Sequence, residues 1–449
     1  MQKQSIWYKL RKISAVRIIV CSFIFLILLG TFLLSLPISY RGERLSLLDT
    51  CFTTTSATCV TGLIIADTAQ HWTFFGQAVL LMLIQIGGLG FMALISLFSF
   101  VAGRRITLKE RVIMSESLSG IEVGGIVRLM RRILYGTLLF EASGAVLLSI
   151  VFIPDFGFLQ GIWKSIFVSV SAFCNAGFDL MGDKYGAFVS LVPYADNVIV
   201  NFTVCGLIIM GGLGFFVWGR PRQKRMSLHT KLVLWTTGVL LISGTVGFFV
   251  LERQNPATIG TMPLAQKWLC AFFQSVSTRT AGFNTVSNAD LTVPAKLLTM
   301  ALMFIGGSPG STAGGIKTVT ALLVFWGTIS ALRGCADINL FGRRVSKTLV
   351  FRAMSVTAAA LMIAGVSVIL LLCFGCGSPI NLVFEVFSAL GTVGLGTGTT
   401  PFLPVASKAI LIILMFIGRV GIMSLAVAVL LKEEKTDAVR LPEEKVLIG

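Results

Sequence analysis

Ser56-Ala57-Thr58-Cys59-Val60-Thr61-Gly62-Leu63 is the first of four similar stretches along the chain. The other three are Ser171-Ala172-Phe173-Cys174-Asn175-Ala176-Gly177-Phe178, Val276-Ser277-Thr278-Arg279-Thr280-Ala281-Gly282-Phe283 and Ser388-Ala389-Leu390-Gly391-Thr392-Val393-Gly394-Leu395. Their glycines, Gly62, Gly177, Gly282 and Gly394, are separated by 115, 105 and 112 residues. Similar segments at nearly regular intervals are typical of internal repeats.

A second glycine-rich landmark follows each of these stretches. The four copies are Gly87-Gly88-Leu89-Gly90-Phe91, Gly211-Gly212-Leu213-Gly214-Phe215, Gly306-Gly307-Ser308-Pro309-Gly310 and Gly418-Arg419-Val420-Gly421-Ile422. They begin 25, 34, 24 and 24 residues after the corresponding glycine of the first landmark. Because two landmarks recur in one order, we interpret the chain as four covalently linked copies of one unit around a shared centre.

The composition places the chain in a membrane. Of its 449 residues, 55% are hydrophobic and 13% are charged, whereas soluble domains average about 25% charged residues. The net charge of +17 lies in short clusters between apolar runs, which is typical of loops facing an anionic leaflet rather than of nucleic-acid binding. The nine cysteines mostly lie inside apolar runs, as Cys21, Cys205 and Cys373 do, and the two histidines lie outside these runs. Neither a disulfide framework nor a metal site is therefore expected.

Each repeat is expected to hold a spanning helix, a short helix and a second spanning helix. The expected spans are 17–37, 77–101, 130–153, 197–218, 231–251, 296–327, 350–374 and 408–431. The short helices are expected near 46–57, 161–173, 264–276 and 380–390. Because about 20 residues are needed to cross a bilayer, we interpret the short helices as re-entrant. The predicted fold class is an all-α polytopic membrane protein, with eight spanning helices and four re-entrant pore helices around a pseudo-fourfold central pore.

The predicted organisation has six segments. They are a cytoplasmic N-terminus at 1–16, pore repeats at 17–105, 106–225, 226–335 and 336–432, and a cytoplasmic tail at 433–449. Lys and Arg cluster at 1–17, 103–132, 219–231, 333–352 and 432–449, which are all termini or junctions between repeats. Because Lys and Arg concentrate in cytoplasmic loops, each repeat must cross an even number of times, with both termini inside.

Re-entrant loops at membrane depth favour a pore. Irregular backbone is tolerated there only where protein buries it or a water-filled cavity receives it. Carbonyl oxygens from four converging loops can replace the hydration shell of a cation, and glycine permits the backbone angles that turn these oxygens inward. The alternative is that each glycine only permits close helix packing. Four glycines in register after four short helices favour the pore.

On these landmarks, residues 15–432 resemble the Trk/Ktr/HKT superfamily of potassium transporters, and most of all the membrane (KtrB-like) subunit of the bacterial Ktr system. The resemblance implies a selectivity filter formed by a glycine in each loop. It also implies that Gly62, where sodium-preferring relatives carry serine, favours potassium. The candidate filter residues are Cys59, Val60, Thr61, Gly62, Cys174, Asn175, Ala176, Gly177, Arg279, Thr280, Ala281, Gly282, Gly391, Thr392, Val393 and Gly394.

Only the fourth loop, with Thr392-Val393-Gly394, is similar to the TVGYG motif of potassium channels. We therefore expect fewer ordered ion sites and weaker selectivity than in such a channel. Arg279 beside the third loop has two interpretations. It is either an outward-facing structural charge that ties the loop to its helix, or a residue that tunes the ions entering the filter.

A glycine-rich segment interrupts the expected span 296–327. It contains Gly306, Gly307, Ser308, Pro309, Gly310, Ser311, Thr312, Ala313, Gly314, Gly315, Ile316 and Lys317. Five glycines and a proline cannot continue a helix without interruption. The segment is not a nucleotide-binding P-loop, because Ile316 stands where that motif needs lysine. It is either a packing kink or a mobile loop below the filter, and the resemblance implies an intramembrane gate.

Arg419 replaces the second glycine of the fourth copy of the second landmark. A charge inside a span costs at least about 2.5–3.5 kcal/mol, so this side chain should face the interior with partners. Glu385 and helix-end carbonyls are the candidate partners. Arg419 is either purely structural or, as the resemblance implies, part of the gate, where its positive charge opposes cation leakage. Glu141, another intramembrane carboxylate, is interpreted as a helix-packing residue rather than an ion ligand.

Together these features predict the potassium-translocating subunit of a Ktr-type uptake system, with no enzymatic activity and no covalent cofactor. K⁺ is the expected cargo and Na⁺ the second candidate. The resemblance implies a homodimer in the cell (inner) membrane and a cytosolic nucleotide-binding regulatory ring (KtrA-like) on its basic face. The alternatives are a broken-helix secondary transporter of another small solute or a less selective Na⁺/K⁺ transporter. An enzyme is disfavoured because no Ser-His or paired-Asp arrangement lies in the spans.

Overall fold

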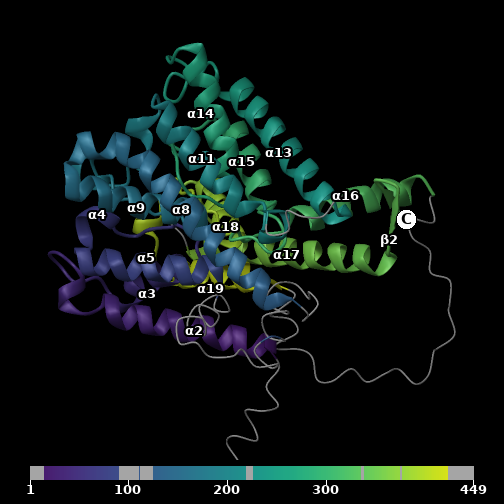
Figure 1. The fold of residues 1–449 in the computed structure, drawn as a ribbon, viewed down its shortest axis with the longest axis horizontal. Helices are drawn as coiled ribbons and strands as arrows, with labels where there is room; N and C mark the ends of the chain where they lie inside the picture. Colours follow the sequence, from purple (N-terminus) through teal and green to yellow (C-terminus); the bar gives the residue numbers. More distant parts are fainter. Residues whose placement is uncertain are drawn as a thin grey trace, which may run out of the picture.

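The computed structural model describes residues 15–90, 111, 125–218, 226–334, 338–374 and 377–422. Within these ranges four helices are long and apolar enough to cross a membrane. They are α2 (Ala15–Leu34), α8 (Ile126–Phe156), α13 (Leu228–Glu252) and α17 (Lys347–Phe374) (Figure 1). Each of them is the first helix of one predicted repeat, so the spacing of the long apolar helices agrees with the fourfold repetition.

A short buried helix follows each long one. These helices are α3 (Leu47–Thr58), α9 (Phe158–Cys174), α14 (Leu264–Ser277) and α18 (Pro379–Gly391). They lie within a few residues of the expected positions and end directly before the glycine-containing loops. In α3 the hydroxyl of the N-cap residue Ser46 accepts a hydrogen bond from the Asp49 amide, which satisfies a donor that the first turn leaves free.

The second helix of each repeat ends at the second landmark. These helices are α5 (Phe74–Leu89), α11 (Val198–Gly212), α15 (Val293–Phe304) and α19 (Val405–Val420). Each landmark contains a glycine with positive φ, namely Gly90, Gly214, Gly310 and Gly421. A positive φ cannot continue a right-handed helix, so the landmark that marks the repeat in the sequence also ends or interrupts the helix.

The expected continuous span 197–218 is therefore wrong. It breaks at Leu213 and Gly214 and resumes as the single turn α12 (Phe215–Trp218). In the third repeat the break is longer, and α16 (Thr318–Leu332) begins only after residues 305–317. The expected spans 77–101 and 408–431 extend past α5 and α19 into residues that the structure does not describe.

The remaining elements are short. They are η1 (Pro37–Ser39), α4 (Thr68–His71), α10 (Gly182–Tyr185), η2 (Val192–Tyr194), η3 (Thr400–Phe402), β1 (Ile338–Leu340) and β2 (Arg343–Val345). The two strands form an antiparallel hairpin in which Ile338 pairs with Val345 and Leu340 with Arg343. The hairpin joins α16 to α17, far from α9 and α4 at the opposite end of the molecule (Figure 1).

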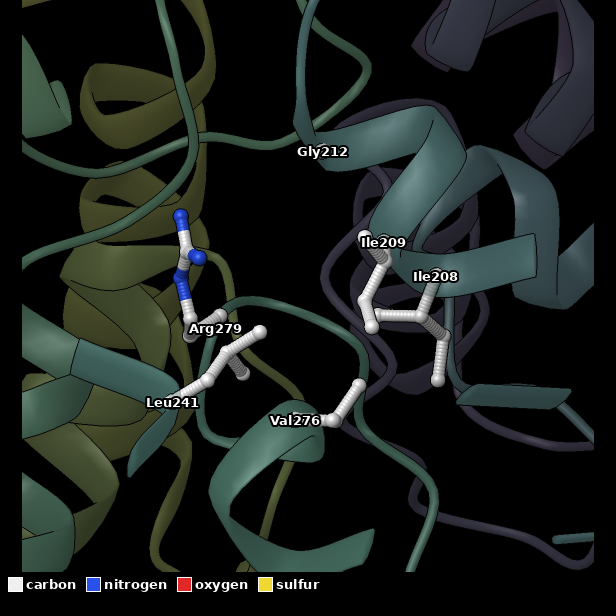
Figure 2. Close-up of a pocket in the computed structure, with 6 residues that line it drawn as sticks. All are labelled: Ile208, Ile209, Gly212, Leu241, Val276 and Arg279. Carbon is white, nitrogen blue, oxygen red and sulfur yellow. The ribbon is translucent and has the colours of Figure 1, made fainter. Parts of the chain in front are cut away.

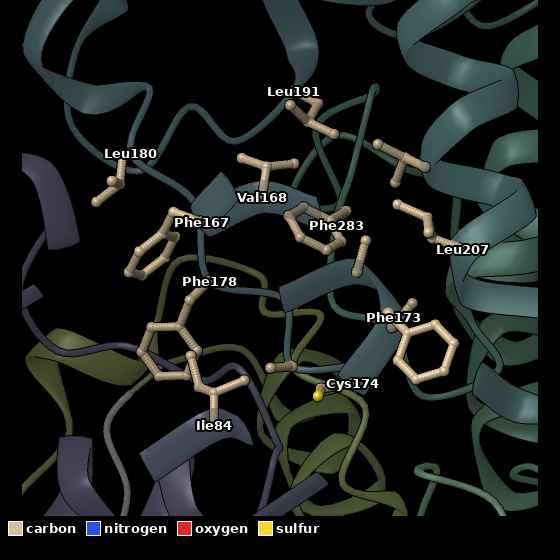
Figure 3. Close-up of a cluster of buried hydrophobic side chains, with 14 of the residues drawn as sticks. Ile84, Phe167, Val168, Phe173, Cys174, Phe178, Leu180, Leu191, Leu207 and Phe283 are labelled. Atoms are coloured by element: carbon tan, nitrogen blue, oxygen red, sulfur yellow. The ribbon is translucent and has the colours of Figure 1, made fainter. Parts of the chain in front are cut away.

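The repeats pack in a closed circular order. The second helix of each repeat contacts the short helix of the next, in the pairs α5 with α9, α11 with α14, α15 with α18, and α19 with α3. The largest buried cluster surrounds α9 and its loop, where Phe167, Phe173 and Phe178 pack with Phe283 of the third repeat (Figure 3). This packing brings the four loops to one place.

Candidate functional site

The glycines of the four loops touch one another around a ring. A Cβ atom added at Gly62 would lie 2.5 Å from Ala176 O, and one added at Gly177 would lie 2.7 Å from Gly282 Cα. A Cβ atom at Gly282 would lie 2.9 Å from Val393 O. A Cβ atom at Gly394 would lie 2.8 Å from Gly62 Cα, which closes the ring. The four predicted loops therefore converge, and no side chain fits at their glycines.

The loops share one backbone conformation. Besides the four glycines, the residue two positions before each of them has positive φ, at Val60, Asn175, Thr280 and Thr392. Such angles are uncommon for residues other than glycine, and for a β-branched residue they mark strain or a special turn. Strained backbone of this kind clusters at functional sites. Fourfold repetition of the same two positive-φ positions gives four geometrically similar arrays of carbonyl groups.

A serine in each short helix holds the loop that follows. The hydroxyl oxygens of Ser56, Ser171 and Ser388 accept hydrogen bonds from Gly62 N at 3.0 Å, Phe178 N at 2.9 Å and Gly394 N at 3.1 Å. Ser277 instead donates to Phe283 O. The serine therefore fixes the loop through an amide in three repeats and through a carbonyl in the third repeat.

Several buried oxygens around the loops have no hydrogen-bond partner among the described residues. They are Thr58 Oγ1, Thr61 Oγ1, Asn175 Oδ1 and Thr392 Oγ1. Buried polar atoms normally have a partner, and an exception needs an explanation such as a bound water or ion. Hard cations take oxygen ligands, so this donor set fits an alkali cation with residual water.

The predicted filter residues occupy two kinds of position. Cys59 caps α3, while Cys174 and Gly391 are the last residues of α9 and α18. The other members, apart from Arg279, lie in the converging loops: Val60, Thr61, Gly62, Asn175, Ala176, Gly177, Thr280, Ala281, Gly282, Thr392, Val393 and Gly394. Asn175 links two loops, because its Nδ2 lies 3.4 Å from Arg279 O and from Thr280 Oγ1.

Arg279 does not face outward as one interpretation expected. Its side chain is 7% exposed and its Nε has no hydrogen-bond partner among the described residues. Figure 2 shows it beside Leu241 and Val276, with Ile208, Ile209 and Gly212 of α11 across a small cavity. Arg279 therefore lies between the second helix of repeat two and the helices of repeat three.

The glycine-rich segment forms a compact loop with a closed neck. Ile305 and Ile316 form an isolated parallel bridge. Gly306 N donates to Ile316 O at 2.9 Å, and Thr318 N donates to Gly307 O at 3.0 Å. Lys317 Nζ donates to Ala313 O at 2.7 Å. The two ends of the loop are thus held together.

The middle of this loop lies against the ends of two pore helices. Thr312 Oγ1 donates to Phe173 O in α9 at 3.2 Å. A Cβ atom added at Gly314 would collide with Thr392 Oγ1, and one added at Gly315 would lie 3.3 Å from Gly391 O. These contacts place the loop directly against the base of the second and fourth pore loops.

The loop is also tied to the broken helix of the second repeat. Ser308 N donates to Gly212 O at 2.9 Å and Phe215 N donates to Gly310 O at 2.8 Å. A Cβ atom at Gly214 would lie 2.7 Å from Pro309 O. The buried Ser311 Oγ in the same loop has no partner among the described residues. Two helix breaks therefore pack against each other below the ring.

Arg419 joins this loop to the first repeat. Its guanidinium donates to Thr312 O, to Gly87 O and, at 2.9 Å, to Gly88 O. The expected alternative of helix-end carbonyls is therefore confirmed and the ion pair with Glu385 is wrong. Glu385 instead accepts hydrogen bonds from Thr397, Thr399 and Thr400 in the segment after the fourth loop.

Sequence reasoning missed a set of polar ties between repeats. The fourth residue of each second helix is polar: Gln77, Asn201, Lys296 and Lys408. Three of them reach the short helix of the next repeat, in the pairs Gln77 with Trp163 at 2.8 Å, Lys296 with Asn381 at 3.1 Å and Lys408 with Asp49 at 2.7 Å. Aligning the repeats on their second helices would have shown the recurring polar position.

The fold and site together define a multi-pass membrane protein of the pore-loop class. The model of the TrkH family, described as a cation transport protein, matches residues 2–439. The potassium/sodium uptake protein NtpJ of Enterococcus hirae is 40% identical over 449 residues, covering 98% of this chain and 98% of the relative. The Ktr system potassium uptake protein B of Bacillus subtilis is 37% identical over 437 residues, covering 96% of each chain.

The fold also has a solved counterpart. The potassium transporter TrkH from Vibrio parahaemolyticus matches with a TM-score of 0.69 and 20% identity, over 91% of this chain and 84% of that one. At this identity the match shows a shared fold alone. With the family match over nearly the whole chain, this protein belongs to the TrkH family of cation transport proteins, and it is a transporter rather than an enzyme.

Proposed function

We propose that this protein is the ion-translocating subunit of a Ktr-type potassium uptake system. The observation that carries the proposal is the closed ring formed by Gly62, Gly177, Gly282 and Gly394. It agrees with the functions of two relatives, a potassium/sodium uptake protein and a potassium uptake protein of a Ktr system. K⁺ is the cargo, with Na⁺ as a second cation, and the membrane potential drives entry.

The ring acts by replacing water around the ion. Carbonyl oxygens of the loop residues bind the dehydrated cation, and the C-terminal ends of α3, α9, α14 and α18 add partial negative charge beside it. Three of the four loops depart from the potassium-channel pattern. We therefore propose fewer ordered sites and weaker discrimination against Na⁺ than in a potassium channel.

The loop from Gly306 to Gly315, with Lys317 and Arg419, is the proposed gate. Its contacts with Phe173, Gly391 and Thr392 support a position directly below the filter. Because Arg419 bridges Thr312 to Gly87 and Gly88, it holds the loop closed and adds a positive charge that repels cations. Ion passage requires that the loop move aside.

The assembly is proposed from the family and the charge distribution. Both termini face the cytoplasm, and the subunit is a homodimer in the cell (inner) membrane. A KtrA-like nucleotide-binding ring docks on the face that carries the Lys/Arg clusters at 103–132, 219–231 and 333–352. The six-segment organisation from 1–16 to 433–449 remains a prediction that places the first and last segments on this face.

The test is cation uptake in cells that lack their own potassium uptake systems. The wild-type chain, co-expressed with its regulatory partner, should restore growth at low K⁺ and take up Rb⁺ saturably. Gly62→Ser should raise Na⁺ uptake relative to K⁺ by about tenfold or more, since a side chain there disturbs adjoining loop carbonyls and a 1.4 kcal/mol change is tenfold. No cation uptake by well-expressed wild type would refute the proposal, and a dominant Na⁺ flux would favour the Na⁺/K⁺ alternative.

A further inference from the structure

Glu141 is a buried carboxyl group that the proposed pathway does not use. It lies in α8 and is 6% exposed. Its Oε2 accepts a hydrogen bond from Gln85 Nε2 of α5 at 3.1 Å. Among the described residues it makes no ion pair with lysine or arginine. Burying such a group in a membrane is costly, and intramembrane carboxyls are functional candidates by default.

Gln85 connects this carboxyl to the second pore loop. The Gln85 Oε1 atom lies 3.4 Å from the thiol of Cys174, which is the last residue of α9 and lies three residues before Gly177. The same thiol lies 4.0 Å from Glu141 Oε1. The three side chains therefore form one polar cluster, with Gln85 in the centre as acceptor from Cys174 and donor to Glu141.

The surrounding backbone leaves Cys174 little freedom. A Cβ atom at Gly88 would lie 2.6 Å from Cys174 Sγ, so α5 packs directly on this residue. Ser169 Oγ donates to Glu141 O at 2.7 Å, which joins α8 to α9. Figure 3 shows Cys174 below Phe173, with Ile84 of α5 nearby. A displacement of Glu141 or Gln85 would be transmitted to the start of the loop.

The loop is held from its other side by Asn175. Its amide nitrogen reaches Arg279 O and Thr280 Oγ1 of the third loop, each at 3.4 Å. Cys174 and Asn175 thus connect consecutive positions of one loop to two different neighbours. The second loop thus has two kinds of contact. A buried carboxyl lies beside the end of the preceding helix, and a side chain of the loop reaches the third loop. Among the described residues, no other pore loop combines the two.

We propose that Glu141 and Gln85 are positioning residues for the second pore loop, acting through Cys174 to set cation affinity and K⁺/Na⁺ discrimination. The inference rests on the proposed function. The pair does not touch the ion. It holds the carbonyl groups of Cys174, Asn175 and Ala176 at the spacing that a dehydrated K⁺ requires, because small changes in loop geometry alter the coordination energies of the two cations unequally.

The experiment compares Glu141→Leu, Glu141→Gln and Gln85→Leu in the uptake assay, with surface amounts measured by quantitative blotting. Glu141→Leu and Gln85→Leu should each raise KM for K⁺ by about fivefold, the cost of roughly one buried hydrogen bond, and should make Na⁺ a stronger competitor. Vmax per transporter should change much less. Glu141→Gln keeps an oxygen for the Gln85 amide, so it should restore nearly wild-type selectivity.

Thr137→Val is the matched control, because Thr137 lies one turn earlier on the same buried face of α8 and its hydroxyl has no partner among the described residues. It should leave KM and selectivity unchanged. The double variant Glu141→Leu/Gln85→Leu should be no worse than either single variant, since both act through one cluster.

Unchanged KM and selectivity in a normally expressed Glu141→Leu protein would overturn the inference while leaving potassium uptake intact. A Glu141→Leu protein that differs from the wild type only in its amount at the cell surface would overturn the inference as well. If Glu141→Leu does not reach the membrane, Cys174→Ala removes the thiol with a smaller change of volume. Normal selectivity in that variant would also overturn the inference. Absence of uptake by the wild type would instead count against the proposed function.

Discussion

Gly282 shows why the ring of glycines tolerates no side chain. Its φ is +80°, and a Cβ atom there would lie 2.8 Å from Gly177 Cα and 2.9 Å from Val393 O. Any substitution would both strain the backbone and push two neighbouring loops away. The constraint belongs to the ring rather than to one loop, because each glycine faces the next repeat.

We predict that Gly282→Ala lowers K⁺ uptake by about tenfold or more, since strain of 1–3 kcal/mol falls on the ion-binding conformation. Gly238→Ala is the control, because Gly238 in α13 has nothing within 4 Å of an added Cβ and should behave as wild type. Rb⁺ uptake normalised to surface protein is the measurement. Equal uptake by the two variants would contradict a close-packed ring.

Asp179 is the residue from which we expect a dependence of K⁺ uptake on pH. It lies two residues after Gly177, in the segment that follows the second loop. Desolvation, with a further contribution from the Asp67 charge, raises the Asp179 pKa to about 6, although the Met181 amide, Ser190 and Lys164 oppose the shift. The carboxyl is therefore charged at neutral external pH and becomes neutral as the pH falls below about 6.

The KM for K⁺ should accordingly rise when the external pH is lowered from 7 to 5, because the negative charge that attracts cations is lost. In Asp179→Asn the KM at pH 7 should equal the higher wild-type value at pH 5 and should not vary with pH. Asp290→Asn, which removes an exposed carboxylate after the third loop, is the control. A persistent pH response in Asp179→Asn would assign the effect to another group.

At the scale of elements, the breaks in the second helices make a gate geometrically possible. The break at Leu213–Gly214 and the loop 305–317 hydrogen-bond to each other through Ser308, Gly310 and Phe215. Backbone N–H and C=O groups that a helix break leaves unpaired at membrane depth must find other partners. Here the groups at each break bond to groups at the other break. If the proposed gate moves, we expect the loop to exchange these partners for water.

Arg419→Ala should therefore weaken the closed position of the loop. Removing two or three hydrogen bonds to carbonyls, each worth up to 1.5–3 kcal/mol for a charged donor, should raise K⁺ flux by about fivefold or more. Arg419→Lys, a point charge that cannot bridge Thr312 to both Gly87 and Gly88, should be intermediate. Flux through purified protein in liposomes measures the effect, and unaltered flux in both variants would remove Arg419 from the gate.

At the scale of the whole molecule, the last repeat must close on the first. Lys408 of α19 and Asp49 of α3 lie 2.7 Å apart, with side chains 11% and 19% exposed. They are 359 residues apart in sequence. This ion pair joins the fourth repeat to the first and so closes the circle of repeats. Comparable contacts at two other junctions join Gln77 to Trp163 and Lys296 to Asn381.

Lys408→Met should destabilise the fold by about 2 kcal/mol, because it leaves a largely buried Asp49 without its partner. Adding Asp49→Leu should recover part of the loss. Lys184→Met is the control, since its ion pair with Asp155 is 3.7 Å long and more exposed. The measurement is the temperature at which the protein in detergent loses its monodisperse peak. Equal temperatures for the Lys408 and Lys184 variants would contradict a stabilising role of the Lys408–Asp49 ion pair.

The sequence by itself determined the membrane location, the fourfold recurrence of a long helix, a short helix and a glycine-containing loop, and the approximate place of each of these. These features depend on local properties: the length of an apolar run, the distribution of Lys and Arg, and glycine where φ must be positive. The interruption after α15 was also predictable, because the backbone chemistry of Gly306–Gly315 cannot support a helix.

Only the tertiary structure decided which loops touch. It showed that Arg419 binds backbone carbonyls rather than Glu385, namely those of Gly87, Gly88 and Thr312. It also showed that Gln85 joins Glu141 to Cys174. It also revealed the break within 197–218 and the buried position of Arg279. These contacts join residues far apart in the chain. They depend on how four similar units rotate and pack around one axis, and one repeat's local sequence carries no information about which side chain of the next repeat it will meet.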